Sequence, residues 1–123
     1  MLLDTHFLLW TALGSSRLAS YEWLADRQPW VISPVSLLEV QFLGEVGRLR
    51  VRPDFFVKIR RDSRYLLDEP ALDAVIQAAL PLAWTRDPFD RLLCGHSVVR
   101  RMPLCTLDRG MLANHPLIPR ELR

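Results

Sequence analysis

Cysteine and lysine are scarce in this 123-residue sequence. Two cysteines, Cys94 and Cys105, are too few for a disulfide framework and lack the C-x-x-C spacing of zinc or redox motifs. We expect both thiols to be buried and unreactive, because free cysteine packs as a small hydrophobic residue. Lys58 is the only lysine among 16 basic residues, so the positive charge is carried by arginine. This excess fits phosphate recognition by guanidinium groups, although a GC-rich genome is the more economical explanation when the arginines are taken alone.

Long hydrophobic runs are also missing. The longest apolar stretches, residues 7–10 and 75–84, are far shorter than the ~20 residues of a membrane span. Asp4 interrupts the N-terminus, where a secretory signal would carry a basic start and an apolar core. The sequence therefore predicts a cytoplasmic protein without a membrane segment.

Half of the residues are hydrophobic and 24% are charged, as in a globular protein. A chain of this length suits one compact domain, which we place over residues 1–123. Short apolar segments alternate with stretches of helical periodicity, so we predict an α/β fold with a short, mainly parallel sheet flanked by helices. The expected strands cover residues 1–3, 30–33, 64–67 and 103–107, with a final edge strand at 117–118. The expected helices cover residues 5–13, 21–26, 34–47, 53–61, 70–80, 88–99 and 108–113.

Four acidic residues stand where these elements begin or end. Asp4 and Asp108 follow two expected strands, and in an open parallel sheet the crevice outside the carboxyl ends of the strands binds ligands. Glu39 and Asp90 lie early in two helices and are placed to approach the same edge. Each aspartate could instead be only a helix cap, and Glu39 could face solvent. The neighbours of Glu39 are apolar, however, and a carboxylate buried among them would need a partner.

A divalent cation would supply that partner. Oxygen ligands without a His or Cys cluster suit Mg²⁺ or Mn²⁺ better than zinc. One or two such ions would support phosphodiester hydrolysis, because a bound metal lowers the pKa of water and stabilises charge on the phosphate. The histidines form no ligand pattern, although His6 is close enough to this site to contact substrate.

Three segments resemble the PIN-domain ribonucleases, in particular VapC-type toxins of bacterial toxin–antitoxin pairs. They are Leu2-Leu3-Asp4-Thr5-His6, then Ser33-Pro34-Val35 through Glu39-Val40, and Asp87-Pro88-Phe89-Asp90-Arg91 with Leu104-Cys105-Thr106-Leu107-Asp108. The resemblance spans nearly the whole chain and implies a three-layer PIN-like fold. It assigns Asp4, Glu39, Asp90 and Asp108 as catalytic metal ligands and Thr5 and Thr106 as hydroxyls beside the site. Asp87 is interpreted as a helix cap, with water-mediated metal binding as the alternative.

The same resemblance implies Mg²⁺- or Mn²⁺-dependent endonucleolytic cleavage of RNA, homodimerisation, and inhibition by a small antitoxin encoded nearby. RNA would be held partly by arginines near the crevice, with Arg91 and Arg109 the first to test because each adjoins an acid of the site. Arg48, Arg50, Arg52 and Arg86 are further candidates. Four tryptophans and five phenylalanines are many for a core of this size, so either a dimer partner or an antitoxin covers Trp10, Trp23 or Trp30, or all of them are core residues.

Two alternative functions fit the sequence less well. Phosphoryl transfer through an aspartyl nucleophile generally needs a lysine beside the phosphoryl group, and Lys58 is far from any expected strand end. A catalytically inactive PIN-like module that binds RNA or a protein is the main alternative, and the presence of all four acids argues against it.

Gly95 is expected to weaken its helix by ~1 kcal/mol relative to alanine.

Overall fold

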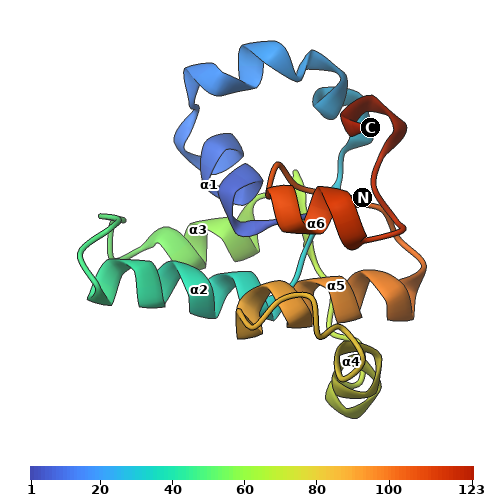
Figure 1. Cartoon of the computed structure of the whole chain (residues 1–123). Coiled ribbons are helices and arrows are strands. Elements are labelled where there is room, and N and C mark those ends of the chain that lie inside the picture. The colour runs from blue at the N-terminus through green and yellow to red at the C-terminus, as the bar shows by residue number, and fades with distance from the viewer.

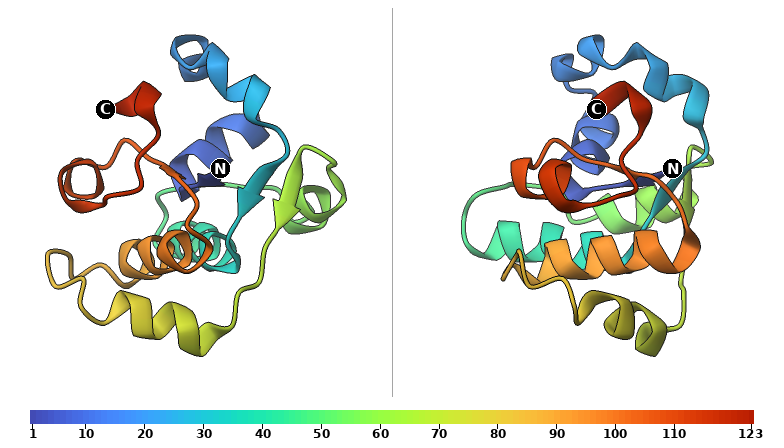
Figure 2. Two further views of the ribbon diagram at one scale, coloured as in Figure 1. Left: turned by 90° about the vertical axis from the view of Figure 1, so that its right-hand side faces the viewer. Right: turned by 45° about the vertical axis from the view of Figure 1, so that its right-hand side comes forward.

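The computed structural model describes residues 1–123 and contains a four-stranded sheet with helices on both faces (Figures 1 and 2). The strands are β1 (Leu2–Leu3), β2 (Trp30–Ile32), β3 (Tyr65–Leu67) and β4 (Leu104–Cys105). The α-helices are α1 (Thr5–Leu13), α2 (Pro34–Glu45), α3 (Phe55–Arg61), α4 (Leu72–Ala79), α5 (Pro88–Arg100) and α6 (Arg109–Asn114). Three 3₁₀ helices, η1 (Ser16–Ser20), η2 (Glu22–Arg27) and η3 (Arg120–Leu122), complete the chain.

All strand pairs are parallel, in the order β3-β2-β1-β4. The predicted α/β fold with a parallel sheet is therefore confirmed. The chain builds β1, β2 and β3 in one direction and then returns to place β4 on the other side of β1. The order of strands thus reverses between β1 and β4, and such a switch point is where open α/β sheets bind ligands.

The alternation of side chains along the strands divides the core into two parts. Leu3, Ile32 and Cys105 face α1 and α3 and pack with residues such as Phe7 and Ile59. The strand residues on the opposite face are Leu2, Val31 and Leu104, which pack with Leu93 and Cys94 of α5 and Met111 of α6. Both cysteines are free and buried, as predicted. Strands β1, β2 and β4 bury both faces, which is why these segments appear in the sequence as short continuous apolar runs, whereas the edge strand β3 leaves Leu66 54% exposed.

Helix α4 lies on the outer side of α5 in all the views (Figures 1 and 2). Gly95 permits this close approach, because a Cβ atom at this position would lie 2.7 Å from the carbonyl oxygen of Val75 in α4. The sequence predicted only the intrinsic cost of a glycine in a helix. The structure adds a packing reason for having glycine there.

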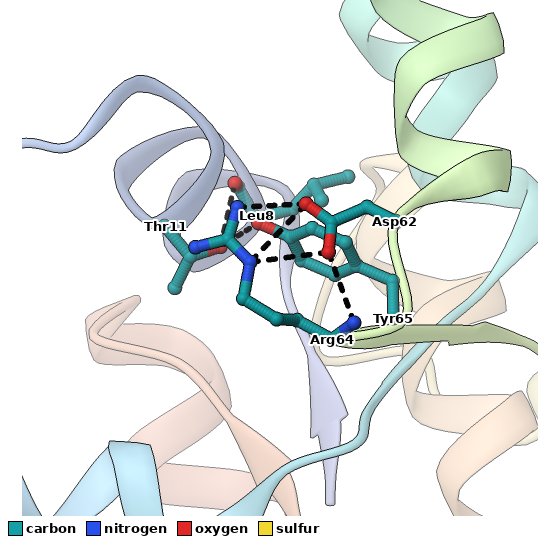
Figure 3. Close-up of polar contacts among 5 residues, drawn as sticks. All are labelled: Leu8, Thr11, Asp62, Arg64 and Tyr65. Atoms are coloured by element: carbon teal, nitrogen blue, oxygen red, sulfur yellow. Dashed lines mark hydrogen bonds and ion pairs between the residues drawn. The ribbon is translucent and has the colours of Figure 1, made fainter.

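The hydroxyl of Tyr65 on β3 donates to Thr11 Oγ1 at 2.8 Å, and the Thr11 hydroxyl donates to the Leu8 carbonyl at 2.9 Å (Figure 3). These buried bonds join the edge of the sheet to α1. Beside them, Arg64 pairs with Asp62 at 2.7 Å in the turn before β3.

Three predicted elements differ from the structure. Residues 117–118 form no strand: Leu104 N donates to Leu117 O at 2.8 Å, but Pro116 and Pro119 flank the segment and cannot donate to a ladder. The helix expected at residues 21–26 is the 3₁₀ helix η2. The helix expected at residues 34–47 ends at Glu45 as α2; Leu38 in it is 63% exposed, while the face that packs inward contains Ser36, Leu37 and Val40.

Of the three tryptophans considered for a partner surface, Trp30 belongs to the core, with its indole N–H donating to Leu24 O at 2.8 Å. Trp10 and Trp23 are only partly buried and pack against the edge of the core. No helix in the structure combines the length and the apolar character that crossing a membrane requires.

Candidate active site

Asp4 and Asp108 stand at the switch point between β1 and β4. Leu3 is in register with Cys105, and the Asp4 amide donates to the Cys105 carbonyl at 3.0 Å. Each aspartate also caps the helix that follows its strand: Asp4 Oδ1 accepts from Phe7 N at 2.9 Å, and Asp108 Oδ1 accepts from Met111 N at 2.9 Å. The capping role and the site role are thus compatible, because a cap uses one carboxylate oxygen and leaves the other available.

Glu39 and Asp90 come from the two neighbouring helices α2 and α5. Both helices begin with proline, and their caps are Ser33, whose Oγ accepts from Val35 N, and Asp87. Asp87 Oδ1 accepts from the amides of Phe89 and Asp90 at 2.8 and 3.3 Å, so the predicted capping role of Asp87 is confirmed. These caps set where each helix begins and therefore which residue reaches the sheet edge.

All four acids line one small cavity of about 40 Å³. Its complete lining is Asp4, Thr5, His6, Glu39, Asp90, Leu93, Asp108 and Met111. None of the four forms an ion pair, and no lysine or arginine lines the cavity. The structure therefore brings together the four residues that the sequence placed at one edge of the sheet.

Burial raises the pKa values of three of the four acids, and neighbouring carboxylates add to the rise at Glu39 and Asp90. Burial and the charges of Asp87, Asp108, Glu39 and Asp4 raise the pKa of Asp90 to about 7. Burial also raises the pKa of Glu39. It raises the pKa of Asp4 as well, although the hydrogen bond that Asp4 accepts from the Phe7 amide acts in the opposite direction. Negative charge gathered without compensation in this way is what a bound cation would neutralise.

Two threonines stand beside the acids. Thr106 Oγ1 accepts from the Asp108 amide at 3.0 Å and so helps to fix the turn after β4. Thr5 Oγ1 is buried and has no hydrogen-bond partner in the protein. An unpartnered buried hydroxyl is costly, so this atom is available to a water or ion in the cavity.

The donor atoms fit a hard divalent cation, since the cavity offers carboxylate and hydroxyl oxygens and no positive counter-charge. A ready-made ligand set is not present, because no group of three His, Cys, Asp or Glu side chains is arranged to hold one ion. Asp4, Glu39, Asp90 and Asp108 would hold the ion after their carboxylates turn toward it. Such a rotation is available to Asp90, whose carboxylate accepts no hydrogen bond within the protein.

The two arginines predicted to contact RNA are placed differently. Arg109 is exposed at the start of α6, next to Asp108. The Arg91 guanidinium donates to the Leu80 carbonyl at 2.7 Å and to the Ala79 carbonyl at 3.3 Å, so it caps the C-terminal end of α4 instead of entering the acid cavity.

Arg17 is a residue that sequence reasoning missed. It lies in η1 and lines a cleft of about 300 Å³ together with Asp4 and Asp108. Nothing in the local sequence marks it, because the turn at Gly14 returns the chain beside Trp10 only in the folded protein.

A comparison with protein-family models matches the PIN domain over residues 1–115. No curated protein matches the sequence. The matched region contains all four clustered acids and every strand of the sheet, and PIN domains are generally metal-dependent nucleases. The chain therefore belongs to the PIN-domain family.

Proposed function

We propose that this protein is a Mg²⁺- or Mn²⁺-dependent endoribonuclease. The observation that carries the proposal is the convergence of Asp4, Glu39, Asp90 and Asp108, from four separate segments, on one cavity that no lysine or arginine lines. Family membership supports a nuclease fold and hydrolase chemistry. The cation would lower the pKa of a bound water and stabilise the charge that develops on the phosphate.

The residues of this chain contribute position and charge. Asp4 and Asp108 each accept a hydrogen bond from a backbone amide, of Phe7 and Met111, which holds one oxygen of each carboxylate beside the cavity. Glu39 and Asp90 add charge from the facing helices, and together the four acids would repel a phosphate in the absence of a cation. Cleavage should therefore depend strictly on a divalent ion.

The test uses single-stranded RNA, whose unpaired bases are open to a protein surface, with Mg²⁺, Mn²⁺ or chelator. Asp4→Asn and Asp108→Asn are the informative variants, because asparagine still caps a helix while the negative charge is lost. Changing even the partners of metal ligands costs about 10- to 100-fold, so each variant should lose at least about 100-fold in rate.

The matched control is Asp73→Asn, an exposed acid in the first turn of α4, which should cleave RNA like the wild type. Cleavage that persists in chelator or in Asp4→Asn would contradict the proposal. RNA binding without cleavage under every cation would identify an inactive binding module instead. Cleavage of single-stranded DNA at the same rate would contradict the restriction to RNA.

We further propose that the nuclease is the toxin of a toxin–antitoxin pair, works in the cytoplasm as a homodimer and is inhibited by a small antitoxin. Exposed apolar side chains support a partner surface, notably Leu72, Ile76 and Leu80, which follow one another at four-residue spacing along α4. Expression of the wild type should arrest growth, and expression of Asp4→Asn should not. Light scattering at increasing concentration measures the oligomeric state, and a monomer throughout would contradict the dimer.

A further inference from the structure

A second, larger cleft adjoins the acid cavity. It encloses about 300 Å³ and shares Asp4, His6 and Asp108 with that cavity. Its other lining residues are Phe7, Trp10, Arg17 and Leu107. A nucleic acid strand bound at the four acids would have to continue across neighbouring surface, and this cleft is open directly beside them.

Arg17 is the only arginine that lines the cleft, and no lysine lines it. Its guanidinium forms no ion pair, although two carboxylates line the same cleft, and it makes no hydrogen bond within the protein. Its five N–H groups are therefore free to bind an anion. An arginine that served only to neutralise Asp4 or Asp108 would be paired with one of them.

Trp10 holds the guanidinium in this position. The centre of the Arg17 guanidinium lies 5.3 Å from the centroid of the Trp10 ring, a distance at which the cation is attracted to the ring face. The indole is itself fixed, stacking with Tyr21 at 6.3 Å and packing edge-on against Phe7 at 5.1 Å. Ser15 Oγ accepts from the Arg17 amide at 3.3 Å and so fixes the backbone at the start of η1.

We propose that Arg17 binds the RNA phosphate next to the one held at the acid cluster, with Trp10 positioning the guanidinium. This inference rests on the proposed ribonuclease function. A planar guanidinium held on an aromatic face presents its edge to phosphate oxygens, which it can contact through two parallel hydrogen bonds. The four acids exclude phosphate unless a cation is bound, so a separate positive group beside them gives the strand a second point of attachment.

The test compares Arg17→Ala, Arg17→Lys and the control Arg60→Ala in steady-state cleavage of single-stranded RNA with Mn²⁺ or Mg²⁺. Arg60 is an exposed arginine without an ion pair on α3, which packs at the opposite edge of the sheet from β4. Removing a contact that is made equally in the ground and transition states raises KM and leaves kcat unchanged, so Arg17→Ala should raise KM about 10-fold.

The salt dependence provides a readout that a structural role would not move. The plot of log(kcat/KM) against log[salt] has a negative slope, and loss of one phosphate contact to a single strand should make this slope shallower by about 0.7. Arg17→Lys should keep the slope of the wild type while raising KM, because lysine retains the charge and loses the two-pronged geometry. Arg60→Ala should match the wild type in both quantities.

The cleavage assays distinguish a failure of the proposed ribonuclease function from a failure of the proposed role of Arg17. If the wild type cleaves no RNA under any cation, the proposed function fails and this inference fails with it. If the wild type cleaves and Arg17→Ala keeps its KM and salt slope, only the role of Arg17 is overturned, and the cleft then serves another kind of partner, such as an acidic protein segment. A fall in kcat with unchanged KM and slope would also overturn the anchoring role.

Discussion

Replacing Asp90 by asparagine should stabilise the metal-free protein at alkaline pH. Asp90 shares the cavity with three other carboxylates, and its pKa is raised from 3.8 to about 7. Because the folded protein binds this proton more tightly than the unfolded chain does, the free energy of unfolding falls as pH rises from about 4 to about 7. The penalty is absent below the unfolded pKa and complete above the folded one.

The size of the effect follows from the pKa and the exposure. A rise of the pKa from 3.8 to about 7 corresponds to a destabilisation of the folded state by about 4 kcal/mol if solvent screening is ignored. Screening at this half-exposed site reduces the destabilisation to about 2 kcal/mol. Asparagine also loses the interaction of a negative charge with the N-terminus of α5, about 0.5 kcal/mol. The net gain for Asp90→Asn at pH 8 is therefore about 1.5 kcal/mol, or roughly 5 to 7 °C in melting temperature.

Urea and thermal denaturation in chelator at pH 4.5 and pH 8 provide the assay. The advantage of Asp90→Asn over the wild type should be small at pH 4.5 and appear at pH 8, whereas Asp26→Asn, at an exposed acid without an ion pair, should show no such change. Added Mg²⁺ should stabilise the wild type more than Asp90→Asn. A variant less stable than the wild type at pH 8 in chelator would refute the reasoning, because it would mean that the Asp90 charge is already compensated inside the protein.

Two further predictions concern packing away from the acids. Gly95→Ala should destabilise the protein by about 1 to 3 kcal/mol in urea denaturation, because α4 must move away from α5; Gly44→Ala, whose new Cβ has ordinary contact distances, should be neutral or stabilising by up to about 1 kcal/mol. Equal effects of the two substitutions would contradict the close-approach explanation. Tyr65→Phe should cost about 1 kcal/mol through loss of the buried bond to Thr11, while Tyr21→Phe, where the hydroxyl has no such bond, should cost less; the reverse order would be inconsistent with the structure.

The strands and the acids were predictable for a common physical reason. Strands buried on both faces must be apolar, so Trp30-Val31-Ile32 could be recognised from composition alone, and the carboxyl ends of such strands locate Asp4 and Asp108. Proline at the start of α2 and α5 fixed where those helices begin, which placed Glu39 in the second turn of α2 and Asp90 in the first turn of α5.

Other features depend on contacts between distant segments. The apolar residues of α2 were clear, but which of them face inward is decided by the helices that pack on it, so the exposure of Leu38 was not predictable. The position of Arg91 follows from the approach of α4 to α5, and that of Arg17 from a turn that brings it onto Trp10. Arginine side chains are long enough that their neighbours in sequence do not determine their contacts.

The order of the strands also determines when the acid cluster can form during synthesis. Asp4 is made before the other three acids, but its neighbour across the switch point, Asp108, follows β4, the last strand of the sheet to be made. Until about residue 108 has left the ribosome and β4 has paired with β1, the crevice lacks one wall. A nascent chain would thus carry a partly folded sheet without an assembled cluster of acids, and the molecule would acquire its full local negative charge only when β4 docks.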